Sequence, residues 1–273
     1  ESFRKFWPAD LHMVGKDIIR FHAVYWPAFL MAAGLPPPKR VFAHGWWTIE
    51  GQKMSKSLGN VIAPADLIER YGVDASRYFL LREVPFGNDG DFSHAQAVQR
   101  INNDLANGLG NLAQRTLSMI AKNCGESVPQ PGALTPEDKQ LLEMAQVRML
   151  AAVRLELDRQ RFHKALDEIW NVVVAANGYI DAQAPWTLKK TDPARMETVL
   201  YALAEVIRCL GLIVQPFVPD SAAKMLDQLA VPADRRGFES LNAEHMLKPG
   251  TKLPPPQGVF PRIVEEELKA VAG

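Results

Sequence analysis

The amino-acid sequence predicts an α/β segment followed by an all-α helical bundle. Short β-type runs alternate with helical stretches up to about residue 92. From residue 93 onward, apolar side chains recur at steps of three, four and seven residues, which is the period of long helices. The length of 273 residues, at roughly 100 to 200 residues per domain, favours two domains.

Composition excludes several classes of protein. Apolar residues make up 47% of the chain, and 31 basic side chains balance 31 acidic ones, which excludes a disordered tail or a polybasic arm. A neutral balance still allows a nucleic-acid partner, because phosphate contacts need only a local basic surface. No apolar run reaches the ~18 residues of a membrane span, and no segment has the layout of a secretory signal. We therefore expect no membrane partner and a cytoplasmic location.

The cysteines and histidines give no pattern of metal ligands. Cys124 and Cys209 have no neighbouring cysteine or paired histidines, so this chain does not support a zinc site and we assign no metal ligand. Both thiols are expected in the core.

Two strands and one apolar helix are expected in the α/β part. The strands are Asp10–Val14 and Arg40–His44, each bounded by turn residues. Between them, Ile18–Leu35 is apolar almost all round, which predicts a buried helix. Pro27 should kink this helix near Ala23.

Helix-start signals divide the second part. Ser93 with Gln96 forms a capping-box pattern that opens a long helix through Met119. Two further helices begin at Thr135-Pro136 and at Asp192-Pro193, and a stripe from Phe162 to Ile180 predicts another that ends before Pro185. The proline-rich tail is expected to be extended and to end in a short helix, Ile263–Ala272.

Residues 51–60, GQKMSKSLGN, form the motif that most clearly indicates ligand binding. Lys53 and Lys56 place two ammonium groups on one glycine-flanked loop, which suits a polyphosphate because each is a compact charge that follows phosphate oxygens. A solvated surface loop is the alternative for an isolated lysine pair.

The surrounding sequence resembles a known family. The stretch K-M-S-K-S followed by LGNVIAPADLIERYGVDASRYFLL is similar to the nucleotide-binding signature of class I aminoacyl-tRNA synthetases. Upstream, LHMVGKDIIRFHAVYWPAFLMAAGLPPPKRVFAHGWWTIEG resembles the methionyl-tRNA synthetases, as do GLGNLAQR and DAQAPW in the helical part. The resemblance covers nearly the whole chain.

The resemblance implies four segments. Residues 1–50 would be the second half of a Rossmann-type catalytic domain, 51–92 the signature lysine loop and stem-contact segment, 93–234 a helical-bundle anticodon-binding domain, and 235–273 the tail. The implied function is that of a methionine-tRNA ligase, which uses ATP and Mg²⁺ to form methionyl-adenylate and then charges initiator and elongator methionine tRNA. No DNA partner is implied.

One departure limits the implied activity. Class I enzymes carry an earlier H-x-G-H signature, and none of the six histidines of this chain lies in that pattern. We therefore expect the first half of the catalytic domain to be missing. The alternative to a ligase is then a non-catalytic tRNA-binding fragment.

The nucleotide residues follow from strand ends and from the resemblance. His12, Gly15 and Asp17 lie where a strand gives way to a helix, the place where α/β sheets bind nucleotides, although Asp17 alone would indicate a helix N-cap. Strand-end packing is the alternative for His44 and Gly45. The resemblance assigns catalysis to Lys53 and Lys56 and assigns ATP binding to His12, Gly15, Asp17, His44, Gly45, Lys53, Ser55 and Lys56.

The resemblance also assigns methionine binding to Ile18, Phe21 and His22. A thioether needs an adaptable aromatic lining, whereas core packing is the alternative for Phe21 and for His22. We interpret the neighbouring Trp26 as core.

Three residues of the helical part are assigned to the tRNA anticodon by the resemblance. Asn111 and Arg115 lie one turn apart on one helix face, with amide and guanidinium groups that suit unpaired base edges. Trp186 follows Pro185 and could stack on a splayed base. A solvated polar stripe and a cap on the bundle are the respective alternatives.

Overall fold

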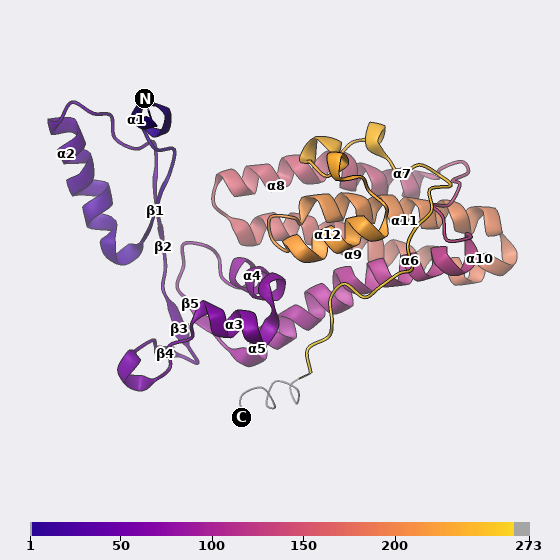
Figure 1. Cartoon of the computed structure of the whole chain (residues 1–273), viewed down its shortest axis with the longest axis horizontal. Coiled ribbons are helices and arrows are strands. Elements are labelled where there is room, and N and C mark those ends of the chain that lie inside the picture. The colour runs from indigo at the N-terminus through magenta and orange to yellow at the C-terminus, as the bar shows by residue number, and fades with distance from the viewer. Residues whose placement is uncertain (1, 265–273) are drawn as a thin grey trace. The chain divides into compact units, whose positions relative to one another are not determined.

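The computed structural model describes residues 2–264, which form two compact units. One unit contains the chain up to Val61 together with Glu83–His94, and the other contains Ile62–Arg82 together with the residues from Ala95 onward. Figure 1 shows the elements of both units. The segment boundaries expected at residues 50, 92 and 234 stay predictions.

The first unit is built on two small sheets. β1 pairs in parallel with β2, with Gly15 opposite His44, and β3 lies between antiparallel β4 and parallel β5. The two expected strands are confirmed, because β1 and β2 fall on them. The elements are α1 (Ser2–Phe6), β1 (His12–Gly15), η1 (Lys16–Ile18), η2 (Phe21–Tyr25), α2 (Trp26–Ala32), β2 (Val41–His44), β3 (Trp47–Ile49), β4 (Gln52–Lys53), η3 (Lys56–Leu58) and β5 (Gly90–Phe92).

The expectation of a buried helix between β1 and β2 is wrong. Of its large apolar side chains only Leu30 is buried, whereas Phe21, Val24, Phe29 and Met31 are exposed. The physical reason is that the described residues leave a broad face of this helix uncovered. Pro27 is the second residue of α2, and the preceding turn, η2, is a π-helix that contains Ala23. The expected kink itself stays a prediction.

The second unit consists of helices. Its long elements are α3 (Pro64–Tyr71), α4 (Val73–Arg82), α5 (His94–Arg100, which starts in the first unit), η4 (Ile101–Gly110), α6 (Asn111–Asn123), α7 (Pro136–Glu143), η5 (Met144–Arg148), α8 (Met149–Asp158), α9 (Phe162–Gln183), α10 (Pro185–Thr191), α11 (Pro193–Ile213) and α12 (Pro219–Gln228). The short helices η6 (Ala233–Arg235), η7 (Phe238–Ser240) and η8 (Ala243–His245) follow.

Most of the predicted helix starts are confirmed. The Thr135 hydroxyl accepts a hydrogen bond from the backbone of Asp138, and the Asp192 carboxylate accepts one from the backbone of Arg195. The long helix runs from α5 to α6, with a π-helical stretch, η4, in its middle. Helices α10 and α12 are not expected from the sequence. Helix α12 begins at Pro219, a first helical position that proline favours.

Helix α11 is the centre of the second unit. It packs against α6, α7, α9, α10 and α12, and nearly all of its residues are buried. Figure 1 shows it between α7, α12 and α9. Cys209 on this helix is a core thiol as expected, whereas Cys124 is only half-buried. Burial, followed by the charge of Glu197, raises the pKa of Cys124 to about 11, so its thiol is a poor nucleophile at neutral pH.

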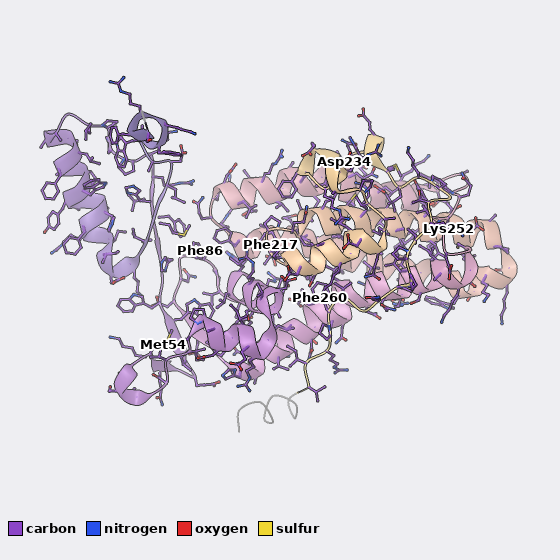
Figure 2. The ribbon with its side chains drawn as sticks, viewed as in Figure 1. Met54, Phe86, Phe217, Asp234, Lys252 and Phe260 are labelled. Atoms are coloured by element: carbon purple, nitrogen blue, oxygen red, sulfur yellow. The ribbon has the colours of Figure 1, made fainter. Side chains whose placement is uncertain are left out.

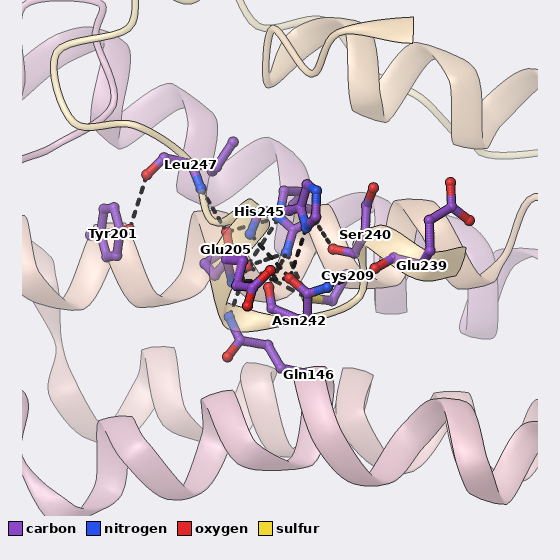
Figure 3. A network of polar contacts seen from close by, with 11 residues as sticks. Gln146, Tyr201, Glu205, Cys209, Glu239, Ser240, Asn242, His245 and Leu247 are labelled. Atoms are coloured by element: carbon purple, nitrogen blue, oxygen red, sulfur yellow. Dashed lines mark hydrogen bonds and ion pairs between the residues drawn. The ribbon is translucent and has the colours of Figure 1, made fainter. Parts of the chain in front are cut away.

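A buried ion pair on α11 fastens the segment that follows η6. The Arg208 guanidinium donates to the Glu205 carboxylate at 2.5 Å, and both side chains are at most 1% exposed. Arg208 also donates to the carbonyl of Ser240, and Glu205 accepts from the backbone of Leu247. Figure 3 shows this network with Asn242, whose carbonyl accepts from Arg208 as well.

The tail beyond α12 has no long helix in its described part. The residues around Pro254–Pro256 form neither a helix nor a strand, and their extended conformation stays a prediction. The short helix expected at Ile263–Ala272 falls, from residue 265 onward, outside the described residues. Within residues 2–264, no helix combines the length and the apolar character that crossing a bilayer requires.

Replacing Arg208 by Ala should lower the free energy of unfolding by about 3–5 kcal/mol, because it leaves the Glu205 carboxylate buried without its partner. Urea denaturation measures the change. The matched control is Arg148→Ala, because Arg148 and its partner Glu143 are both largely exposed. Its expected loss of unfolding free energy is no more than about 1 kcal/mol. Equal losses in the two variants would contradict the assignment.

Candidate functional site

A pocket of about 580 Å³ opens where β2 ends and the lysine loop begins. Two predicted nucleotide residues from the end of β2, His44 and Gly45, and one from the loop, Lys53, lie on its wall. Figure 2 labels Met54 and Phe86, which line it from different segments. The remaining lining residues are Met13, Trp46, Trp47 and Thr48.

The strand ends place a glycine and a carboxylate beside this pocket. Gly15 lies opposite His44, and a Cβ on Gly15 would stand 2.5 Å from the Oδ1 atom of Asp17. Asp17 lies within η1, whose N-cap position is Gly15, so the N-cap alternative for Asp17 is wrong. Its carboxylate faces the indole of Trp46, with Nε1 3.5 Å from Oδ1.

His44 and Gly45 shape the floor of the pocket. A Cβ at Gly45 would collide with the backbone of Asn88, so this position needs glycine for close backbone approach. The His44 Nδ1 atom donates to the carbonyl of Gly45 at 2.9 Å, and its ring stacks on Phe86. His44 therefore packs at the end of its strand and also lines the pocket.

The lysine loop is closed by a side chain that the sequence pattern does not single out. Asn60 accepts from the backbone of Ser55 at 2.8 Å and donates to the carbonyl of Lys53 at 3.1 Å. The Ser55 and Ser57 hydroxyls lie 2.7 Å apart. The Gly-Asn pair after the motif is the sequence signal for this role of Asn60, because asparagine side chains favour hydrogen bonds to the backbone of a turn. The side chain of Lys56 lies outside the described residues.

Trp46 is a second residue that the sequence pattern does not single out. The Lys16 ammonium lies 4.6 Å from the centre of its ring and the Lys53 ammonium 5.9 Å from it, both within the range of cation–π attraction. Lys16 also pairs with Asp89 at 2.6 Å. The Lys16 hydrogen bond, and then that of the Trp46 backbone, lower the pKa of Asp89, which favours its charged form.

A second pocket, of about 610 Å³, opens beside η2 and α2. Its wall is almost wholly aromatic, and it contains the predicted methionine residues Phe21 and His22. His12, predicted as a nucleotide residue, lines this pocket instead of the first. The remaining lining residues are Tyr25, Trp26 and Phe29.

Exposure decides between pocket and core for these aromatic residues. Phe21 is 57% exposed and Trp26 is 38% exposed, which contradicts the core alternative for Phe21 and the core interpretation of Trp26. The His22 Nδ1 atom lies 3.0 Å from the carbonyl of Ile18, which orients the ring. Ile18, the third predicted methionine residue, is not on the wall of this pocket and contacts His22 through its backbone.

The structure brings two of the three predicted anticodon residues together. The guanidinium of Arg115 lies 5.4 Å from the centre of the Trp186 ring and pairs with Asp181 at 2.7 Å. Trp186 lies on α10 and is 45% exposed, which does not fit a buried cap on the bundle. Asn111, one turn before Arg115, is exposed as well.

A charged cluster holds the junction from which Trp186 projects. Arg195 donates to both oxygens of Asp138, at 2.5 and 2.7 Å, and to the side-chain oxygen of Gln183 at 2.7 Å. The Tyr179 hydroxyl donates to Asp138 at 2.6 Å. Gln183 ends α9, and the next residue, Ala184, takes the left-handed conformation (φ 43°) that turns the chain into α10.

Comparisons with known proteins show which family the chain resembles over both of its parts. A family model described as tRNA synthetases class I (M) matches residues 1–117, and one described as the anticodon binding domain of methionyl tRNA ligase matches residues 128–272. Both the predicted fold class, a partial catalytic domain followed by a helical anticodon-binding domain, and the family resemblance are confirmed.

Relatives in two organisms illustrate the similarity. A methionine–tRNA ligase of Brucella suis is 61% identical over 262 residues, which are 96% of this chain and 50% of the relative. A solved structure of Mycobacterium tuberculosis methionyl-tRNA synthetase in complex with methionyl-adenylate superposes with a TM-score of 0.92 at 54% identity, and covers 96% of this chain and 52% of that one. The chain thus spans about half the length of the curated relatives it matches.

Asp138 should make stability depend on pH. Burial would raise its pKa, but hydrogen bonds from Arg195, Tyr179 and the backbone of Thr135 outweigh burial and lower the pKa to about 2. A depressed carboxyl pKa stabilises the fold above the unfolded value of 3.8, by about 2 kcal/mol at neutral pH, and this contribution is lost as pH falls through about 2.

The stability difference between wild type and Asp138→Asn should therefore be largest at pH 7 and shrink between about pH 4 and pH 2. Urea unfolding at several pH values measures it. Asp227→Asn, which changes a carboxylate that is 65% exposed, serves as the control and should show a small difference throughout. A difference for Asp138→Asn that does not vary with pH would contradict the role of its charge.

Proposed function

Because the chain belongs to the methionyl-tRNA ligase family, we propose that it is the part of a methionine–tRNA ligase that carries the lysine loop and the anticodon-binding bundle. The complete enzyme activates methionine with ATP and transfers it to initiator and elongator methionine tRNA in the cytoplasm. The observation that carries the proposal is the contact of Arg115 with Trp186 on an exposed face of the bundle, in the same chain as a lysine-bearing pocket.

The two pockets of the first unit suit the two small substrates. The first has an ammonium group at its rim and strand ends on its wall, which supports nucleotide binding. The second is lined by aromatic rings and offers few polar atoms. A thioether makes few hydrogen bonds, so such a lining selects it by shape and by sulfur–aromatic contact.

The first reaction step is attack of the methionine carboxylate on the α-phosphate of ATP, with pyrophosphate as the leaving group. Lys53, together with Lys56, stabilises the charge that develops on the departing phosphates. No side chain of the enzyme attacks the substrate, so catalysis depends on position and charge.

Mg²⁺ is expected to arrive on the ATP phosphates. Within residues 2–264, no three histidine, cysteine, aspartate or glutamate side chains gather as a cation site. Mg²⁺ commonly keeps several waters and binds through substrate phosphates, where it would neutralise phosphate charge. The roles of Lys53 and Lys56 do not depend on a protein ligand for the ion.

In the second step the terminal ribose hydroxyl of tRNA attacks the adenylate carbonyl, so that an ester bond to methionine forms and AMP leaves. In the bundle, the exposed Trp186 ring offers a stacking surface, and Asn111 and Arg115 offer hydrogen-bond donors beside it. The Asp181 carboxylate holds the Arg115 guanidinium over that ring in the free protein. The chain therefore provides a preformed surface for unpaired anticodon bases.

The second candidate is a tRNA-binding fragment without catalysis. It rests on the proposed anticodon residues Asn111, Arg115 and Trp186, which all lie in the helical part of this chain. Pyrophosphate exchange with methionine and ATP, measured beside binding of methionine tRNA, separates the two. Exchange by the complete enzyme supports the ligase, tRNA binding without exchange supports the fragment, and the lack of both would contradict both proposals.

In the complete ligase, Lys56→Ala should slow adenylate formation far more than it weakens methionine binding, because its charge acts as the phosphate bond breaks. Lys53→Ala should behave similarly but less severely. Rapid-quench kinetics measures the step. Lys39→Ala, which removes an exposed lysine paired with Asp10, is the control and should leave the rate unchanged. An unchanged rate in Lys56→Ala would remove this lysine from the mechanism.

Trp186→Ala should reduce affinity for methionine tRNA roughly 5- to 150-fold, which corresponds to one lost base stack of ~1–3 kcal/mol, and should spare pyrophosphate exchange. Trp186→Phe should retain part of the affinity. The control is Val174→Ala, which truncates an exposed side chain on α9. Charging of tRNA and pyrophosphate exchange are compared in each variant, and equal losses in both assays would mean that the substitution damaged the fold.

A further inference from the structure

Trp46 joins the nucleotide pocket to the lysine loop. It follows Gly45 directly, lines the first pocket, and leaves its side chain 48% exposed at the rim. A half-exposed indole presents a ring face that attracts cations. The partners that the structure gives it are two ammonium groups.

The two lysines differ in how they are held. Lys16 lies 4.6 Å from the ring centre and is fixed from the other side by both oxygens of Asp89, each at 2.6 Å. Lys53 lies 5.9 Å from the ring centre. Among the residues that the structure describes, no carboxylate lies within ion-pair distance of the Lys53 ammonium, and the Trp46 ring is its cation–π partner.

Two carboxylates hold Trp46, one at its backbone and one at its indole. The backbone N–H of Trp46 donates to Asp89 at 2.9 Å, and its Nε1 lies 3.5 Å from Asp17. Asp89 thus fixes both Lys16 and the backbone beneath the ring. Its negative charge also offsets the repulsion between two ammonium groups that share one aromatic ring.

We propose that Trp46 is a positioning residue, whose indole holds the Lys53 ammonium at the rim of the nucleotide pocket before the polyphosphate binds. The inference rests on the proposed function. A lysine side chain has high rotamer freedom, so restricting it beforehand lowers the entropy lost on binding. Loss of an exposed cation–π contact should weaken polyphosphate binding by about two- to five-fold.

Ring-current shifts test the contact directly. In the chain labelled with ¹³C at the lysine ε-carbons, the ε-protons of Lys53 and Lys16 should resonate upfield of those of exposed lysines, and Lys53→Ala assigns the first signal. Trp46→Leu should abolish the upfield shift, whereas Trp46→Phe should keep part of it. An unchanged Lys53 signal in Trp46→Leu would overturn the proposal, and unchanged amide spectra elsewhere verify that the variant is folded.

Titration with ATP separates this inference from the proposed function. We expect ATP to move the Lys53 signal, with a dissociation constant about two- to five-fold higher in Trp46→Leu and restored in part by Trp46→Phe. Equal affinity in wild type and Trp46→Leu would overturn the positioning role. If ATP moved no lysine signal while the shifts still depended on Trp46, the contact would stand, but its role in polyphosphate binding and the nucleotide assignment would fail.

Discussion

Helix α11 is buried along nearly its whole length, so its charged side chains must find partners on the elements around it. Glu205 and Arg208 neutralise one another and use their remaining hydrogen-bonding capacity on Ser240 and Leu247, which fastens the segment after η6 to the bundle. Near the first turn of the same helix, Arg195 reaches Asp138 on α7. Satisfying these buried charges orders the helices and the segment around α11.

The same constraint reaches the proposed tRNA surface. Arg195 also binds Gln183, the last residue of α9, next to the left-handed Ala184 that turns the chain into α10. Trp186 projects from the first turn of α10, where Arg115 lies over its ring. In the first unit, strand pairing positions the residues of the nucleotide pocket. The parallel pairing of β1 with β2 places Gly15 opposite His44 where the two strands end. Both candidate sites are therefore built by elements that packing or pairing has already fixed.

Local signals predicted the elements well, and contacts between distant residues were harder to predict. The N-caps Thr135 and Asp192 follow from chemistry within one turn, and both are present. Burial of the helix that contains Phe21 was predicted wrongly, because apolar composition does not reveal which segment covers it. Trp46 and Asn60 were missed because their roles depend on partners that only the fold brings near, and α10 was missed because seven residues are too few for periodicity.

The proposed function depends most on the bundle presenting a ready surface for anticodon bases. Hydrogen–deuterium exchange of the 273-residue chain, with and without the anticodon stem-loop of methionine tRNA, tests that surface most directly. We expect added protection in residues 107–115 and 181–190, and much less with a stem-loop whose anticodon has been changed. Protection confined to other segments, or equal protection by both stem-loops, would contradict it.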